Sequence, residues 1–375
     1  MRVVPILCAG LLVQAATGQA LGQAGAPDAE SALREGTRAQ EHGDLKTAIA
    51  DFRKALSLKP DLVEAHANLG AALAASGQLN AAIEEDVLAL DAAPQNEAVR
   101  MNLAMAYYRA GDWNHARIEF ERLHAVHPEG LNTAVLLAYA YNKLNREADA
   151  AALLAPFAPG HEGDFQFEYV YAYALIASGK QDDGLPRMEK LAKEKNSAEA
   201  WLVAGSTRFY RGEMKIARED LDAAVALNPK LPGLQTMAGQ ARYAMRDMPA
   251  AASAFQEALR ADPVDFVANR DLGAMRLKEG DTGNARPLLE LALQLQPRDP
   301  LTRLEVAKLD DQTGKYAEAA AILEDLVKSD PNWLDPHWVL AQVYSEMNRP
   351  EEGRRERGIA HEIELKQKAA TEKKN

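Results

Sequence analysis

The sequence predicts an all-α protein, built as a solenoid of tandem helix–turn–helix units. Glycines recur every 34 residues at Gly43, Gly77 and Gly111, and prolines keep the same spacing at Pro60 and Pro94. Alanine is abundant, which favours helix, and aromatic residues make up only 6% of the chain, which is low for a β-sandwich or barrel. A fixed period of this length is typical of repeat proteins, in which each unit packs mainly on its neighbours.

Both markers continue along the chain, with a single step of 33 residues between Gly179 and Gly212. The glycine position also recurs at Asn145, Arg246, Gly280, Gly314 and Asn348, and the proline position at Pro128, Pro229, Pro263, Pro297 and Pro331. We expect the first marker to form the turn between two helices and the proline to end the second helix. The pattern predicts nine to ten units, starting near Ala29, Val63, Glu97, Leu131, Phe165, Ala198, Pro232, Phe266, Pro300 and Leu334.

Small and large residues alternate at matched places in these units. A small residue lies before each turn, as at Gly36, Gly70 and Ala104, and an alanine usually follows five residues after the turn. Close packing of the two helices is therefore predicted, with larger apolar residues filling the space beside them. Those residues are Phe52, Phe120, Leu221, Phe255, Leu289 and Leu323, whereas the second unit has Asp86 at this place.

This pattern resembles the tetratricopeptide repeat, and the resemblance covers about nine tenths of the chain. The clearest unit contains Trp201, Gly205, Gly212, Ala217, Leu221, Ala224 and Asn228-Pro229. The resemblance implies a right-handed superhelical α-solenoid over residues 29–350. It also implies a concave surface, lined by the first helix of each unit, that binds peptides or proteins and carries no catalytic activity.

Two parts of the repeat array are irregular. Pro156 falls inside a predicted second helix and should shorten it, so that residues 154–164 form an irregular connection. Residues 182–197 lack the final proline and carry Asn196 instead, while Pro186 and Pro287 are expected in the first turns of their helices. Residues 351–375 are predicted to form a charged capping helix and a tail.

The first 26 residues have the composition of a secretory signal peptide. Arg2 is their only charge, an apolar stretch covers residues 3–13, and small residues precede candidate cleavage points between positions 20 and 26. We therefore expect export to the periplasm or outside the cell. An N-terminal tail without a targeting role is the alternative, and lipidation at Cys8 is disfavoured because the residues before it are large.

Charge and motif content limit the function. The net charge of −12 argues against nucleic acid as a partner. No phosphate loop, HExxH, CxxC or GxSxG motif occurs, and the spacing of His115, His124 and His127 does not place them on one helix face. We therefore expect no enzyme activity, no metal and no cofactor. No stretch is long and apolar enough to predict a transmembrane helix.

Aromatic and methionine residues gather on one face of the predicted first helices of units 3 to 7. Such side chains are common at recognition surfaces, and they are equally suited to fill the core between units. Both interpretations stay open for the candidate groove residues, which are Met101, Asn102, Met105, Tyr108, Tyr139, Asn142, Tyr169, Tyr173, Phe209, Tyr210 and Tyr243.

Some members of the tetratricopeptide repeat family hold a C-terminal carboxylate with lysine, asparagine and arginine from three successive first helices. The matching places here lack the basic residues, because they carry Leu33, Thr37, Asn68, Ala98 and Asn102. The favoured hypothesis is a scaffold of the cell envelope that binds a protein or peptide in its groove. The alternatives are a structural or polysaccharide-binding element, similar to repeat regions of exopolysaccharide export systems, and a solenoid that self-assembles end to end.

Overall fold

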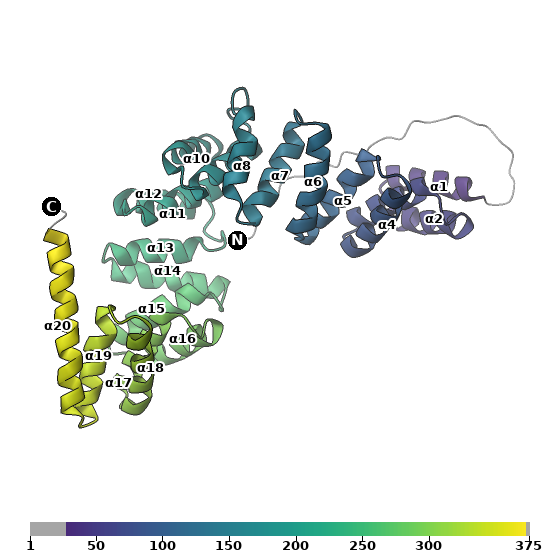
Figure 1. Ribbon diagram of the computed structural model, residues 1–375. Helices are drawn as coiled ribbons and strands as arrows, with labels where there is room; N and C mark the ends of the chain where they lie inside the picture. The colour runs from purple at the N-terminus through teal and green to yellow at the C-terminus, as the bar shows by residue number, and fades with distance from the viewer. Residues whose placement is uncertain (1–27, 373–375) are drawn as a thin grey trace. The chain divides into compact units, whose positions relative to one another are not determined.

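The computed structural model describes residues 28–372, and within this range the chain forms twenty α-helices and no strand. These residues divide into two units, 28–196 and 197–372. In the first unit the helices follow one another as tandem pairs (Figure 1). They are α1 (Ala29–Glu41), α2 (Leu45–Leu58), α3 (Val63–Ala75), α4 (Leu79–Ala92), α5 (Glu97–Ala110), α6 (Trp113–Val126), α7 (Leu131–Lys143), α8 (Glu147–Leu154), α9 (Phe165–Ala177) and α10 (Gln181–Lys195).

The second unit repeats the same arrangement with five further pairs. Its helices are α11 (Ala198–Tyr210), α12 (Met214–Leu227), α13 (Leu234–Ala244), α14 (Met248–Ala261), α15 (Phe266–Lys278), α16 (Thr282–Leu295), α17 (Pro300–Gln312), α18 (Tyr316–Ser329), α19 (Leu334–Glu346) and α20 (Pro350–Glu372). The predicted starts of the repeats coincide with the first residues of first helices, with one exception. At Pro232 the chain is still in a turn, and α13 begins at Leu234 after Gly233 adopts a positive φ of 78°.

Short polar side chains start many of these helices. Asp44 accepts a hydrogen bond from the backbone N–H of Thr47 at the start of α2, and Asp112 accepts one from His115 at the start of α6. Asp164 does the same for Phe167 at the start of α9. Each carboxylate satisfies a backbone donor that has no partner within its own helix, so these helix starts are encoded locally.

The turn position behaves as its spacing predicts. Gly111 has φ 77°, and Asn145 and Arg246 take the same left-handed conformation with φ 56° and 62° at equivalent places. After Gly111, the backbone N–H of Asp112 donates to the carbonyl oxygen of Tyr107 and closes the turn. Each turn therefore reverses the chain over a few residues and sets the second helix against the first.

In several pairs a glycine of the first helix faces a large apolar residue of the second, whereas Gly70 faces Asp86. A Cβ atom added to Gly36 would lie 2.7 Å from ring atoms of Phe52, so only glycine allows this close approach. The large residues Phe52, Phe120 and Leu289 are fully buried, which confirms the predicted packing. First helices of successive pairs also contact one another, as α1 with α3 and α7 with α9.

The irregular part of the first unit lies where the prolines predict it. Helix α8 has only eight residues, and Pro156 lies in the short 3-10 helix Ala155–Phe157 that follows. The expectation for Pro186 and Pro287 was wrong, because each is the sixth residue of its helix rather than part of the first turn. Both prolines are exposed, so water can reach the helix carbonyl that loses its usual N–H partner.

Helix α20 packs against α19 as the second helix of the tenth pair, and it continues to Glu372. The segment 351–375, predicted as a charged capping helix and a tail, forms the greater part of α20 as far as residue 372. The predicted signal peptide, residues 1–26, lies outside the described residues. Across 28–372, none of the helices combines the length and the apolar character that a membrane span requires.

Candidate functional site

The predicted groove residues of the first unit converge on one group of aromatic side chains. We define the aromatic cluster as Tyr108, Trp113, Tyr139, Tyr169 and Tyr173, which come from α5, α6, α7 and α9. Tyr108 and Tyr139 are only 8% and 9% exposed and belong to the hydrophobic core of this region. Tyr169 and Tyr173 on α9 are half-buried, so the cluster has a core side and a side that solvent reaches.

The rings on the core side are in close contact. The ring centroids of Tyr108 and Tyr139 lie 5.3 Å apart, and Trp113 lies 5.3 Å from Tyr108 and 5.8 Å from Tyr139. The Tyr108–Trp113 pair is perpendicular at 88°, an edge-to-face geometry that aromatic quadrupoles favour. These contacts hold Tyr139 in a defined place beneath the outer tyrosines.

The hydroxyl groups of Tyr169 and Tyr173 lie near that of Tyr139. Burial raises the pKa of Tyr139, and the neighbouring Tyr169 and Tyr173 raise it further. Burial also raises the pKa of Tyr173, with a smaller effect from the negative charge of Glu147. Tyr139 and Tyr173 are therefore neutral at physiological pH, and each offers a phenolic O–H together with an apolar ring.

A lysine lies on this group of rings. The Lys143 Nζ lies 5.3 Å from the ring centroid of Tyr139 and 6.0 Å from that of Trp113, within the range of a cation–π contact. Partial burial lowers the pKa of Lys143. Lys143 is also the last residue of α7, where the helix dipole favours a positive charge.

The remaining candidate residues of the first unit are half-buried and lie on α5 and α7. Met101 and Met105 are half-buried and pack against the same core, and Asn102 is half-buried on the same helix. Asn142 donates from its Nδ2 to the carbonyl oxygen of Val170 at 3.3 Å and so links α7 to α9. The structure therefore brings together Tyr108, Tyr139, Tyr169 and Tyr173, with the two methionines beside them.

Three candidates belong to the second unit. Phe209 is half-buried against the core of α11 to α13, whereas its neighbour Tyr210 is 74% exposed and packs edge-on against Phe209 at 5.4 Å. Tyr243 on α13 is 39% exposed. These residues do not form part of the aromatic cluster, which is confined to residues 28–196.

Sequence reasoning missed Trp113 and Lys143. Trp113 is the first residue of a second helix, at the repeat position occupied by Leu45, Leu79 and Met248, so a search limited to first helices does not reach it. Lys143 follows Tyr139 by four residues and therefore shares its helix face. The i, i+4 pairing of an aromatic residue and a lysine was the signal that could have identified it.

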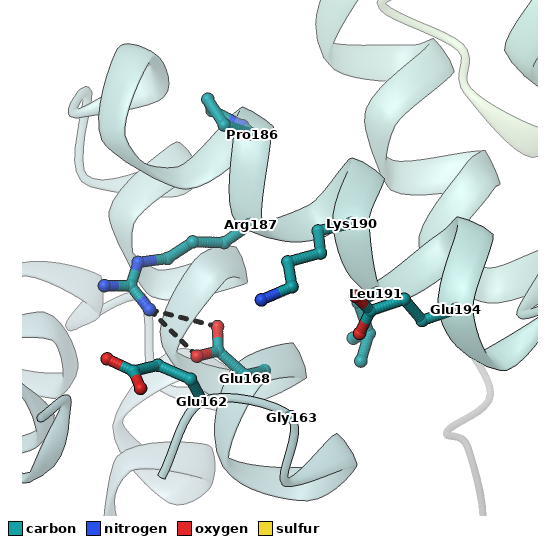
Figure 2. A pocket seen from close by; sticks show the side chains of 8 residues that line it. All are labelled: Glu162, Gly163, Glu168, Pro186, Arg187, Lys190, Leu191 and Glu194. Carbon is teal, nitrogen blue, oxygen red and sulfur yellow. Dashed lines mark hydrogen bonds and ion pairs between the residues drawn. The ribbon is translucent and has the colours of Figure 1, made fainter. Parts of the chain in front are cut away.

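A second feature is a pocket beside α10, with a volume of about 290 Å³. Figure 2 shows its side chains, with Arg187 Nη1 donating to both carboxylate oxygens of Glu168 at 2.9 and 3.2 Å. Glu162, Lys190 and Glu194 complete its charged lining. Acidic and basic groups of this lining lie close together, so the pocket offers no uniform charge to a ligand.

The pocket has a structural origin in the repeat pattern. In three other repeats, the fourth residue of the first helix contacts both a glutamate of the second helix and the carbonyl oxygen of the preceding proline. His66 contacts Glu85 at 2.6 Å and the Pro60 carbonyl at 2.9 Å, and Arg100 and His337 do the same in their own repeats. Glu168 occupies this place in α9. Its carboxylate can only accept hydrogen bonds, so it cannot bind a backbone carbonyl oxygen of the loop before α9. The pocket is the space left beside this loop.

The histidines of α6 and its exit do not converge. His115 contacts Asp112, and His127 contacts Glu97 on α5 at 2.8 Å. Among the residues with described positions, no three histidine, cysteine or acidic side chains are grouped so that they could hold a metal ion.

Comparison with known protein families agrees with the repeat architecture. Family models described as "Tetratricopeptide repeat" match residues 98–130, 236–300 and 276–342, and one described as "TPR repeat" matches residues 41–77. A tetratricopeptide repeat protein from Parabacteroides merdae ATCC 43184 is similar in structure, with a TM-score of 0.53 and 18% identity over 71% of this chain and 98% of that chain. This similarity concerns the fold.

Two further solved structures have lower scores. Yeast Tom70 has a TM-score of 0.36 and 15% identity, over 91% of this chain and 96% of that chain. YrrB, described as a TPR protein with an unusual peptide-binding site, has a TM-score of 0.41 and 21% identity, over 50% and 97%. Ten helical pairs, four family matches and the shared fold lead to one conclusion: the chain is a tetratricopeptide repeat protein, with a fold that supports protein–protein interaction.

Proposed function

We propose that this protein is a non-catalytic scaffold that binds a peptide or protein segment on the first-helix surface of residues 97–177. The observation that carries the proposal is the half-buried pair Tyr169 and Tyr173 on α9, supported from below by the buried Tyr139. Ordered tyrosines that remain partly accessible lose little conformational entropy when a partner covers them. An apolar ring and a hydroxyl on each suit contact with peptide side chains and backbone.

The test compares partner recovery by two forms of the full chain. The wild type and the double variant Tyr169→Ala/Tyr173→Ala are tagged, recovered from envelope fractions, and analysed by quantitative mass spectrometry. We expect specific partners to be depleted at least tenfold with the double variant, while circular dichroism shows unchanged helicity. The exposed Tyr210→Ala serves as the control, because it removes a tyrosine outside the aromatic cluster.

Equal recovery of partners by the wild type and the double variant would remove the aromatic cluster as the binding surface. Polysaccharide binding is the competing function, since tyrosine rings also stack on sugars. Retention of soluble envelope glycans by the wild type, with no protein partner recovered, would favour that alternative.

Export is part of the proposal, and it rests on the composition of residues 1–26. Cell fractionation and N-terminal sequencing of the mature protein test it. We expect periplasmic or secreted protein that begins after one of positions 20 to 26. Cytoplasmic protein with an intact Met1 or Arg2 would contradict it.

A further inference from the structure

The ammonium group of Lys143 lies on aromatic rings and has no ion-pair partner among the described residues. Its Nζ faces Tyr139 and Trp113, and among the described residues no carboxylate lies within ion-pair distance of it. Other cations of the first unit that lie on tyrosine rings have an acidic partner, since Arg146 has Asp149 at 2.7 Å and Arg187 has Glu168 at 2.9 Å. Lys143 is therefore unusual in its environment.

The equivalent residue of the preceding repeat shows a purely structural use of this position. Arg109 lies 34 residues earlier and donates from Nη1 to the Ala74 carbonyl oxygen at 2.7 Å, which caps the C-terminus of α3. Lys143 makes no such bond to the end of α5 within the described residues, because its side chain lies on the rings of the cluster instead. The repeat architecture does not by itself require a cation in this place.

A partly dehydrated ammonium group is attracted to an anion more strongly than one in bulk water. Burial removes part of the hydration of Lys143 and lowers its pKa, while the two rings offset only part of that loss. Glu147 at the start of α8 acts on the Tyr173 hydroxyl, but among the described residues it forms no ion pair with Lys143.

We propose that Lys143 anchors a carboxylate of the bound peptide, so that the partner is an acidic segment with an apolar or aromatic residue next to its acid. This inference rests on the proposed function, and it names the chemistry of the partner. The carboxylate lies against the ammonium group, and the neighbouring apolar residue packs on the accessible rings of Tyr169 and Tyr173. Complementary charge and apolar contact together select the segment.

The experiment uses a phage-displayed library of random dodecapeptides, selected on the full chain. Selected peptides are synthesised with a fluorescent label, each beside a counterpart in which the acids are replaced by their amides. Their Kd values are measured for the wild type, Lys143→Met, and the double variant Tyr169→Ala/Tyr173→Ala. Lys190→Met is the matched control, because Lys190 is an exposed lysine outside the cluster. Circular dichroism and thermal melting confirm that each variant is folded.

We expect the selected peptides to contain an acid, and the amide counterpart to bind the wild type about tenfold more weakly. Lys143→Met should lower affinity for the acidic peptide to the same degree and should no longer distinguish acid from amide. Lys190→Met should behave as the wild type.

The outcomes distinguish a failure of the Lys143 anchor from a failure of the proposed binding surface. Binding that Tyr169→Ala/Tyr173→Ala abolishes but Lys143→Met leaves unchanged would overturn the anchor and keep the binding surface. Binding that neither variant changes, or a selection that enriches no peptide, would overturn both.

Discussion

Asp86 packs directly against Gly70, with its carboxyl group where other repeats place an apolar side chain. Both residues are fully enclosed between α3 and α4, and neither carboxyl oxygen of Asp86 has a hydrogen-bond partner. The equivalent contact elsewhere joins Gly205 with Leu221 and Gly273 with Leu289. The second repeat therefore keeps the shape of this contact and loses its apolar character.

Replacement of Asp86 with leucine should stabilise the protein. The substitution removes an unsatisfied buried carboxyl group and fills the same space with the side chain that repeats 6 and 8 use. We expect a gain of about 2 kcal/mol in the free energy of unfolding, measured by urea denaturation. Asp91→Leu on the exposed face of α4 is the control and should change stability by less than about 0.5 kcal/mol. A destabilised Asp86→Leu variant would show that this repeat needs the acid.

The effect of Asp86 on the free energy of unfolding should also depend on pH. Burial raises its pKa from 3.8 to about 8, and Glu85 adds a smaller repulsion. Between these two values the folded state binds more protons than the unfolded state, so this residue makes stability fall as pH rises. Its slope is at most about 1.4 kcal/mol per pH unit. Urea denaturation at pH 5 and pH 8 should show a widening advantage of Asp86→Asn over the wild type. Parallel pH dependence of the two proteins would contradict the shifted pKa.

Glu168 on α9 and Arg187 on α10 form an ion pair. Its charges are reversed relative to the equivalent pair of Arg100 on α5 and Glu119 on α6, which allows a charge-swap experiment. Glu168 is only 8% exposed and Arg187 is 32% exposed, so Arg187→Ala leaves a nearly buried carboxylate without its partner. We expect a loss of about 2 kcal/mol in the free energy of unfolding, because the carboxylate loses the donor of its hydrogen bonds. The double variant Glu168→Arg/Arg187→Glu restores the polarity of Arg100 and Glu119, and it should be more stable than Glu168→Arg alone. Equal stability of those two variants would mean that the pair contributes nothing.

Tyrosines of the candidate site should differ in their structural importance. Tyr139 is 9% exposed and contacts Tyr108 and Trp113, so Tyr139→Ala should destabilise the protein by about 3 kcal/mol. Tyr210 is 74% exposed, and Tyr210→Ala should change stability by less than about 0.5 kcal/mol. Thermal and urea denaturation measure both effects. Similar losses for the two variants would show that burial does not govern their contribution.

Much of the fold was predictable because the signals are local and repeated. Glycine or asparagine occupies nine of the ten turns, with Arg246 at the other, and proline follows most second helices. These residues act through the backbone of a few positions. The exceptions have local causes as well. Gly233 delays the start of α13, and an exposed proline at the sixth position of α10 does not end that helix.

The candidate site was only partly predictable. Helical spacing placed the tyrosines of α5, α7 and α9 on related faces, but spacing cannot say how far neighbouring helices cover them. Two of the predicted tyrosines are buried and two are half-buried, so core packing and surface access both occur within one set. Trp113 joined the set through a contact between α6 and α7, which the sequence does not show.

The sequence by itself determined the number of repeats, their helical pairs and the small-to-large contact within each pair, because these depend on backbone conformation and side-chain volume at fixed spacing. Only the tertiary structure decided which tyrosines remain accessible, that Lys143 lies on aromatic rings rather than on a helix end, and that Asp86 is enclosed without a partner. These properties arise from side chains of several helices meeting in space, and their burial sets the hydration and charge on which binding and pKa depend.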